Sequence, residues 1–142
     1  MFKDILLPID LPNRASQMKV AEIAIQQARQ SGARLHAMTV VPSFGLAMVG
    51  SYFPQDFEKR AIEDTTEALR SFCEEVMPDD VTVQHVVAHG TIYSEILRVA
   101  EELGCDLIVM ASHRPELKDY LLGPNAARVV RHAQCSVMVV RD

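Results

Sequence analysis

Five short apolar runs, separated by stretches with helical periodicity, constrain the fold of this chain more than any other feature. The runs are typical of buried strands, and they cover Ile5–Ile9, Leu35–Val41, Val81–Val87, Leu107–Ala111 and Val137–Val140. Between them, apolar residues recur three and four positions apart, as in amphipathic helices, over Ser16–Ser31, Phe57–Val76, Thr91–Leu103 and Asn125–Ala133. This alternation predicts an α/β fold, in which helices cover both faces of a parallel sheet and the crossovers are right-handed.

Length, charge and hydropathy limit the class of protein. At 142 residues, without an internal repeat or an interdomain linker, the chain is predicted to form one domain over residues 1–142. Its net charge of −5 and its lack of a Lys/Arg run argue against a nucleic-acid partner. No apolar stretch approaches the roughly 20 residues of a membrane span, and the N-terminus lacks the features of a signal peptide. We therefore expect a cytoplasmic protein that binds neither nucleic acid nor membrane.

The three cysteines agree with that location. Cys73, Cys105 and Cys135 are odd in number, widely spaced and without a C-x-x-C motif, and apolar residues lie near each of them. We expect them to be small buried hydrophobic side chains in a reducing compartment. A reactive thiol is the alternative interpretation.

Polar residues follow several of the predicted strands. Asp10 follows the first strand, Pro42 begins the segment after the second, His89-Gly90 follows the third, and Ser112–Arg114 follow the fourth. In open parallel sheets, ligands bind outside the carboxyl ends of the strands, where the strand order reverses. We therefore expect the ligand site among these residues.

The stretch from Asp106 to Asn125 has the features of an anion site. An apolar strand ends at a polar loop that contains Arg114, and Gly123-Pro124 then precedes a helix. Unpaired backbone N–H groups and the helix dipole favour an anion at such a helix start. Gly123 permits a close backbone approach to a phosphate, whereas Pro124 supplies neither an N–H nor a hydroxyl. A plain helix start with proline in its first turn is the alternative.

Asp10 and His113 are the candidate polar side chains near this stretch. The Asp10 carboxylate suits a hydrogen bond from a ribose hydroxyl or a base amine, but an Asx turn before Pro12 explains it equally well. His113 has no obvious orienting carboxylate or nucleophile, so no catalytic residue is predicted. His85 and His89 would lie about 13 Å apart on a strand, and neither they nor the cysteines have the spacing of a metal site. The glycine motifs of dinucleotide and P-loop sites are absent from the sequence.

The segment Pro42–Pro54 interrupts the alternation. Its Gly and Pro content is typical of a loop, yet it is strongly apolar, and connections of this length are uncommon and often functional. It is interpreted as a lid over a ligand or a partner contact, or as a loop that packs on the second helix of its own domain.

Together these pieces resemble the universal stress protein family over essentially the whole chain. Ile5–Asp10 is similar to the first strand of the family and its nucleotide-contacting aspartate, and His89–Leu97 to its turn into the third helix. The most specific likeness covers Ala111–Pro115, Tyr120–Gly123 and Arg131–Arg141, and it is closest to small single-domain bacterial members with Ser-His-Arg-Pro in the fourth-strand loop. The resemblance implies a doubly wound, five-stranded parallel sheet with strand order 3-2-1-4-5 and helices on both faces.

The resemblance also implies a site, because the ATP-binding members of the family hold the nucleotide between strands one and four. The nucleotide-binding residues implied here are Pro8, Ile9, Asp10, Val40, Met110, Ala111, Ser112, His113, Arg114, Gly123, Pro124 and Asn125. In this assignment Pro8, Asp10 and Val40 contact adenine or ribose. Met110 and the following loop approach the ribose and phosphates, and the last three residues lie at the phosphate end.

The chain departs from the better-known family pattern, G-x2-G-x9-G-[ST]. Ala111 and Arg114 stand where that pattern has glycines, the spacer to Gly123 is one residue shorter, and Pro124 replaces the hydroxyl residue. A lost hydrogen bond to a charged group costs about 1.5–3 kcal/mol, or roughly ten- to hundredfold in affinity. The guanidinium of Arg114 could offset that loss through a bidentate phosphate contact.

The chain is accordingly predicted to be a stress-response or regulatory protein that binds ATP or AMP, with Mg²⁺ accompanying ATP, and that lacks efficient turnover. A protein-interaction module that has lost nucleotide binding is the first alternative, based on Pro124 and the apolar segment Pro42–Pro54. A slow ATPase is the second, for which Asp10 is the one obvious Mg²⁺ carboxylate. In the strand order of the family the last strand lies at a sheet edge, which predicts a homodimer through Val137–Val140.

Overall fold

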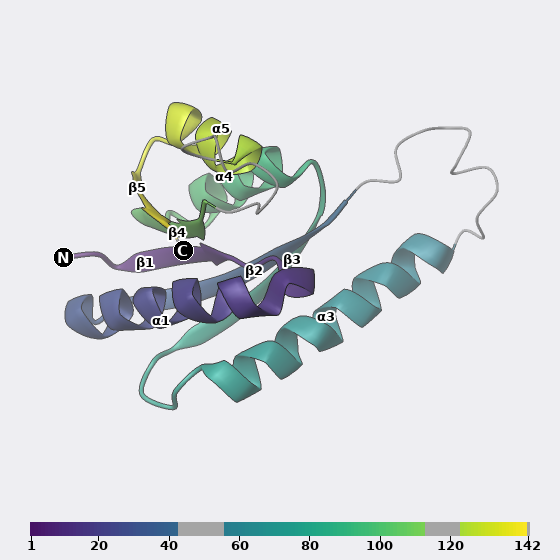
Figure 1. The fold of residues 1–142 in the computed structure, drawn as a ribbon, viewed down its shortest axis with the longest axis horizontal. Coiled ribbons are helices and arrows are strands. Elements are labelled where there is room, and N and C mark those ends of the chain that lie inside the picture. Colours follow the sequence, from purple (N-terminus) through teal and green to yellow (C-terminus); the bar gives the residue numbers. More distant parts are fainter. Residues whose placement is uncertain (43–55, 113–122, 142) are drawn as a thin grey trace.

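The computed structural model describes residues 1–42, 56–112 and 123–141, and it contains the predicted alternation of strands and helices (Figure 1). The strands are β1 (Asp4–Pro8), β2 (Arg34–Pro42), β3 (Val83–Gly90), β4 (Leu107–Ala111) and β5 (Ser136–Val140). The helices are α1 (Arg14–Ser31), α3 (Asp56–Val76), α4 (Ile92–Glu102) and α5 (Pro124–His132), and a 3-10 turn, η1 (Leu11–Asn13), precedes α1. The predicted α/β fold class is therefore confirmed.

The strands form one parallel sheet in the order β3-β2-β1-β4-β5, as predicted. The central strand β1 pairs with β2 on one side and with β4 on the other, so that Ile5 lies between Leu35 and Leu107. The chain moves outward from β1 in one direction through β2 and β3, and in the other through β4 and β5. The strand order thus reverses between β1 and β4, where the family resemblance implies the nucleotide site.

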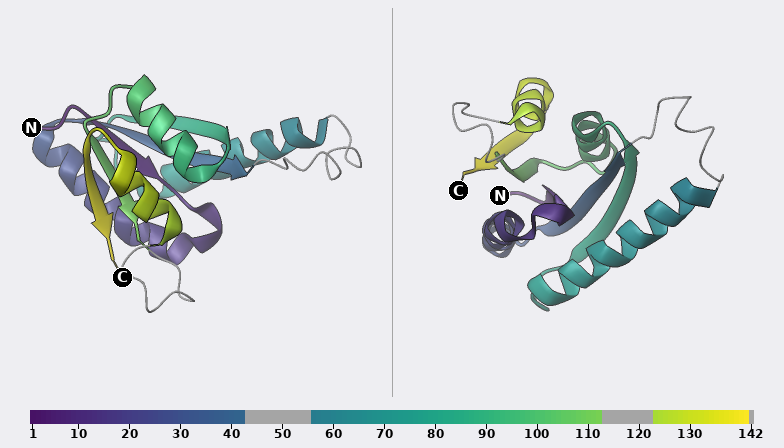
Figure 2. Two further views of the ribbon diagram at one scale, coloured as in Figure 1. Left: turned by 90° about the horizontal axis from the view of Figure 1, so that it is seen from above. Right: turned by 45° about the vertical axis from the view of Figure 1, so that its right-hand side comes forward.

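Two apolar cores lie on opposite faces of the sheet. The right-hand view of Figure 2 shows α1 and α3 on one side and α4 and α5 on the other. Leu7 on β1 packs with Val20 of α1 on the first side, whereas its neighbour Leu6 packs with Ile96 of α4 and Val129 of α5 on the second. Because successive strand residues point to opposite faces, a strand covered on both sides is apolar throughout.

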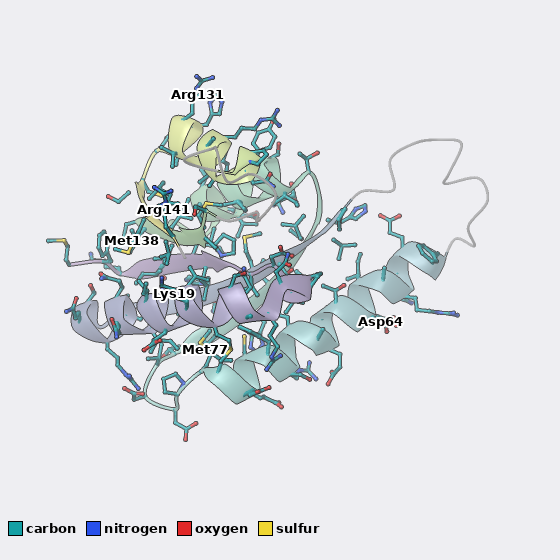
Figure 3. The ribbon with its side chains drawn as sticks, in the orientation of Figure 1. Lys19, Asp64, Met77, Arg131, Met138 and Arg141 are labelled. Carbon is teal, nitrogen blue, oxygen red and sulfur yellow. The ribbon has the colours of Figure 1, made fainter. Side chains whose placement is uncertain are left out.

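The ends of α1 follow from sequence and long-range contacts. The helix ends at Ser31, the predicted last residue, and Gly32 follows it in the left-handed conformation (φ 67°) that glycine adopts without strain. Near its start, the Lys19 amine donates a hydrogen bond of 2.7 Å to the backbone carbonyl of Arg141, directly after β5 (Figure 3). The partly buried Met138 of β5 also packs against the α1–α3 core. Helix α1 is thereby tied to the last strand.

The third strand differs from its prediction of Val81–Val87, since it begins at Val83 and continues to Gly90. Val81 is apolar because it is buried against the α1–α3 core, and its N–H bonds to the carbonyl of Pro78 in the turn before the strand. His89 and Gly90, expected after the strand, are its last two residues. The predicted helical ranges Thr91–Leu103 and Asn125–Ala133 include Leu103 and Val130, whose side chains are 36% and 45% exposed.

Polar side chains join the amino ends of the central strands. The Asp106 carboxylate before β4 accepts backbone N–H bonds of 3.0–3.2 Å from Lys3 and Asp4. The Asp4 carboxylate in turn accepts bonds from Nε2 of the buried His36 at 2.9 Å and from Nε of Arg34 at 3.0 Å. The His36 hydrogen bond, followed by Arg34, holds the pKa of Asp4 below its ordinary value. These carboxylates therefore fasten strand starts together.

Within the described parts of the chain, no helix combines the length and the apolar content needed to cross a bilayer.

Candidate functional site

A cleft of about 260 Å³ opens at the carboxyl end of the sheet, between the ends of β1, β2 and β4 and the starts of α4 and α5. Its lining residues are Pro8, Ile9, Asp10, Pro12, Gln17, Met38, Thr39, Val40, Pro42, Ile92, Ile96, Met110, Ala111, Ser112, Gly123, Pro124, Asn125 and Ala126. This position, beside the reversal of strand order, is where open α/β sheets bind ligands. Ligand pockets usually measure about 300–1,000 Å³, so the volume suits a small ligand.

The cleft brings together the predicted site residues that the structure describes. All ten of them line it: Pro8, Ile9, Asp10, Val40, Met110, Ala111, Ser112, Gly123, Pro124 and Asn125. The remaining two, His113 and Arg114, lie outside the described residues, as does the segment after Pro42 that was interpreted as a lid or partner contact.

Asp10 lies between the end of β1 and η1, and its side chain is exposed. One carboxylate oxygen accepts a 2.6 Å bond from the Asn13 side-chain amide, and the Asp10 backbone carbonyl accepts the Asn13 N–H at 3.0 Å. The Asp10 side chain makes no capping bond to the backbone of the turn that follows. The Asx-turn interpretation of Asp10 is therefore wrong in detail, because the turn is closed by a backbone carbonyl and leaves the carboxylate at the cleft.

Gln17 fixes the backbone of Asp10, and the sequence analysis missed it. Its side chain is only 4% exposed. Its Oε1 accepts the Asp10 N–H at 3.0 Å, and its Nε2 donates to the Ser16 hydroxyl at 3.1 Å. A glutamine on the buried side of α1, one turn before Val20, was the available signal. A buried polar group in an apolar stripe needs a partner, and here that partner is the cleft loop.

Thr39 performs a similar task on β2. Its hydroxyl, in a residue that is 7% exposed, donates a 2.9 Å hydrogen bond to the carbonyl of Ile9. That bond joins the residue after β1 to the middle of β2, on the floor of the cleft. The other lining residues that were not predicted as site residues are Pro12, Met38, Pro42, Ile92, Ile96 and Ala126. Most of these are apolar side chains that the sequence assigned to the core or to loops.

Helix α5 presents its first turn to the cleft. Gly123 precedes it, and Pro124 occupies the first turn as predicted. The N–H of Gly123 already donates to the carbonyl of Ser112 at 2.9 Å, and a Cβ at Gly123 would lie only 2.9 Å from that oxygen. Gly123 is thus required for the close approach of its backbone to Ser112. Because Pro124 has no N–H, Asn125 and Ala126 supply the first-turn N–H groups that lack an intrahelical acceptor.

The start of α5 is also held against α4. The guanidinium of Arg128 stacks over the Tyr93 ring, with 4.7 Å between its central carbon and the ring centroid. Such contacts are worth about 0.5–1 kcal/mol at exposed sites. This contact and the shared α4–α5 core position the helix start that forms one wall of the cleft.

The charge of the described lining is simple, because Asp10 is its one ionisable side chain. The described residues contain no group of three His, Cys, Asp or Glu side chains able to hold a metal ion. His85 and His89 lie on β3, and Nε2 of His89 is 2.9 Å from a carboxylate oxygen of Glu58 on α3. The cleft therefore combines apolar walls, one carboxylate and two backbone donors at a helix start.

Comparison with known proteins establishes the relationship of the chain. The model of the universal stress protein family matches residues 1–141. The chain belongs to this family. It is 31% identical to universal stress protein G of Escherichia coli O157:H7, over 99% of this chain and 100% of the relative. It is 30% identical to a universal stress protein of Methanocaldococcus jannaschii, over 99% of this chain and 83% of that relative.

Solved structures of universal stress proteins share the fold. Universal stress protein UspA from Lactobacillus plantarum superposes with a TM-score of 0.79 at 21% identity, covering 98% of this chain and 97% of that one. A universal stress protein solved in complex with cAMP superposes with a TM-score of 0.63 at 19% identity, covering 99% and 97%. At these identities the likeness concerns the fold.

Proposed function

We propose that this universal stress protein is a regulatory nucleotide-binding protein, which holds ATP or AMP in the cleft without efficient turnover. The observation that carries the proposal is the convergence of Asp10, the apolar ends of β2 and α4, and the first turn of α5 on one cleft at the switch point of the sheet. A family relative solved with bound cAMP supports the choice of an adenine nucleotide.

The apolar half of the cleft suits the base. Met38 and Val40 of β2 line it together with Ile92 and Ile96 of α4, against which they pack in the α4–α5 core. Flat aromatic rings gain free energy when such side chains remove them from water, at about 25 cal/mol per Å². The exposed Asp10 carboxylate then accepts hydrogen bonds from the ribose hydroxyls, while Gln17 holds its backbone in place. These groups recognise a nucleoside.

The end of the cleft proposed for the phosphates offers weaker recognition than the end proposed for the nucleoside. Asn125 and Ala126 offer backbone N–H groups at the positive end of the α5 dipole, which favours an anion. Pro124 removes a third donor from the same turn. Arg114, which the family resemblance assigns to this end, supplies a compensating positive charge. With ATP, Mg²⁺ would bind to the phosphates of the nucleotide itself. We therefore propose that AMP suits this cleft better than ATP, because its single phosphate needs fewer hydrogen-bond donors.

Isothermal titration calorimetry with ATP, ADP, AMP and cAMP tests the proposal. Asp10→Ala is expected to weaken binding ten- to hundredfold, because a hydrogen bond to a charged group contributes about 1.5–3 kcal/mol. Arg114→Ala is expected to weaken the binding of ligands that carry a phosphate and to leave the affinity for adenosine unchanged. Asp64→Ala, which removes a carboxylate from the exposed side of α3 (Figure 3), is the matched control. Absence of heat with every nucleotide would contradict the proposal.

Pro124 also favours a second candidate, a protein-interaction module that has lost the ligand. Mass spectrometry of small molecules released from the purified protein separates the two, since a co-purified nucleotide excludes the second. A slow ATPase ranks third, because Asp10 is the one carboxylate in the described lining. Phosphate release no faster than in buffer, at high protein concentration, removes it.

We also propose a homodimer through β5. This strand lies at the edge of the sheet, where it pairs with β4 through one side alone among the described residues. Val137, Met138 and Val139 are only partly buried there. An apolar edge strand invites pairing with a second copy. Light scattering at micromolar concentration tests this, and a monomeric mass would contradict it.

A further inference from the structure

The three cysteines divide between the two faces of the sheet. Cys73 on α3 is buried in the α1–α3 core, whereas Cys105 and Cys135 both belong to the α4–α5 core. Both also line a second cavity of about 260 Å³, which lies between the C-terminal ends of α4 and α5, at the amino end of the sheet. This cavity is separate from the nucleotide cleft and shares none of its lining residues.

The strand register places these two cysteines at the same end of one strand pair. Leu107 at the start of β4 pairs with Ser136 at the start of β5. Cys105 lies two residues before β4, and Cys135 directly precedes β5. Neighbouring strands lie about 4.8 Å apart, and disulfides span Cα separations of about 4.4–6.8 Å.

The two side chains also share their surroundings. Cys105 is 7% exposed and buried in the α4–α5 core, and the half-buried Cys135 packs against the same core. The Cys135 side chain is among the groups that influence the ionisation of Cys105. Both cysteines thus line one cavity beside the starts of β4 and β5.

We propose that Cys105 and Cys135 form a thiol pair that a small-molecule disulfide, such as oxidised glutathione, converts into an intramolecular disulfide. The Cys135 thiolate attacks the small disulfide, forms a mixed disulfide and releases one thiol. The Cys105 thiolate then attacks the Cys135 sulfur, and the second thiol leaves. The protein loses two thiol hydrogens and two electrons, which reduce the small disulfide to two thiols.

Burial sets the order and the speed of this exchange. It raises the pKa of Cys105 to about 12, with the Asp4 carboxylate as a smaller cause, and it also raises the pKa of Cys135. Because the thiolate is the nucleophile, exchange is slow at neutral pH and begins at the more accessible Cys135. The new disulfide joins the residues just before β4 and β5. It closes a covalent loop from Cys105 to Cys135, which contains β4, the predicted site residues that follow it, and α5.

The experiment uses the full chain, reduced and then incubated with oxidised glutathione at mildly alkaline pH. After acid quenching and alkylation, non-reducing peptide mapping is expected to find a Cys105–Cys135 cross-link and a free Cys73. Cys73→Ala, the matched control, is expected to form the same cross-link. Cys105→Ala is expected to stop at a glutathione adduct on Cys135. Mapping of the wild-type chain decides the question even where that variant fails to fold.

A thermal scan supplies a second readout. Closing the loop from Cys105 to Cys135 is expected to raise Tm by several degrees, on the order of 5–10 °C, and reduction is expected to reverse the rise. Cys135→Ala is expected to show no shift after the same treatment. Stable glutathione adducts on the wild-type chain, cross-links between two chains, or a cross-link through Cys73 would each overturn the proposal.

Discussion

The two ends of the sheet use carboxylates in opposite ways. At the amino end, Asp4 and Asp106 have their oxygens occupied by backbone N–H groups, His36 and Arg34. At the carboxyl end, Asp10 is exposed, and the side-chain contact described for it comes from Asn13. A carboxylate whose acceptors are satisfied within the fold holds strands together, whereas an exposed one beside an apolar cleft is available to a ligand.

The direction of the helices strengthens this contrast. Helix α5 begins at the carboxyl end of the sheet and ends at the amino end, so first-turn N–H groups face the cleft and last-turn carbonyls lie near the thiol pair. An anion is favoured at the first of these ends and disfavoured at the second. Ligand binding and structural cross-linking are therefore expected at separate ends of the same helix.

Removing the Asp4 carboxylate should produce the largest loss of stability. Asp4→Ala leaves Nε2 of the buried His36 without its acceptor and frees Arg34, which costs about 2–3 kcal/mol at neutral pH. Chemical denaturation measures the change. Asp79→Ala, at an exposed carboxylate after α3, serves as the control and should cost less than about 0.5 kcal/mol.

The pH dependence of that loss has a definite sign. The pKa of Asp4 is lowered in the folded state, first by the His36 hydrogen bond. Its contribution to the free energy of unfolding is thus fully present above the unfolded pKa of about 3.9 and disappears as the pH falls through the folded value. The gap between wild type and Asp4→Ala should narrow below about pH 4, and a constant gap would show that the charge is irrelevant.

Crowding the start of α5 should damage the cleft and the fold together. In Gly123→Ala the new Cβ would lie 2.9 Å from the Ser112 carbonyl oxygen, so the backbone at one of these two residues must move. Overpacking of this kind costs about 1–3 kcal/mol, and nucleotide binding should weaken with it. Ser112→Ala keeps the carbonyl and should preserve stability. Equal stability of Gly123→Ala and wild type would refute the close approach.

Replacing Gln17 should show whether its amide positions Asp10 for nucleotide binding in addition to stabilising the fold. Gln17→Leu leaves the Asp10 N–H without its acceptor, at a cost of about 1 kcal/mol in unfolding free energy. Nucleotide affinity should fall about fivefold because the Asp10 loop is less well held. Gln26→Leu, on the exposed side of α1, should change neither quantity. An unchanged affinity for Gln17→Leu would remove Gln17 from the site.

The last expected effect is a gain in affinity. Pro124→Ser restores an N–H and a hydroxyl to the first turn of α5, and it should tighten AMP and ATP five- to tenfold, or about 1 kcal/mol. Adenosine, without a phosphate, should bind as before. Pro124→Ala restores the N–H alone and should give an intermediate affinity. Unchanged calorimetric affinities would mean that phosphates do not reach this turn.

Prediction from sequence succeeded where a local pattern corresponds to one kind of secondary structure. Apolar runs located four of the five strands to within a residue or two, and helical periodicity located the end of α1 at Ser31. It failed at the start of β3, because apolar character at Val81 reports burial and not extended backbone. The strand order came from the family resemblance, since pairing between distant segments leaves no local pattern.

The sequence located the site residues that lie at strand ends. It did not identify those whose role depends on side-chain hydrogen bonds. Strand ends located Asp10 and Ser112 because their place depends on topology alone. Gln17 and Thr39 were missed, since their role depends on partners, the Asp10 N–H and the Ile9 carbonyl, that the sequence does not pair with them. His113 and Arg114 lie outside the described residues, so their place in the site stays a prediction.

Amide chemical shifts recorded during titration with AMP show where the nucleotide binds. A nucleotide site in this cleft predicts saturable shifts at the carboxyl end of the sheet, at Asp10, Val40 and Ala126, and unchanged resonances at the amino end, at Asp4 and Cys105. Asp10→Ala should weaken the response while preserving the spectrum of the fold. Shifts confined to the amino end, or no saturable shifts at all, would contradict a nucleotide site in this cleft.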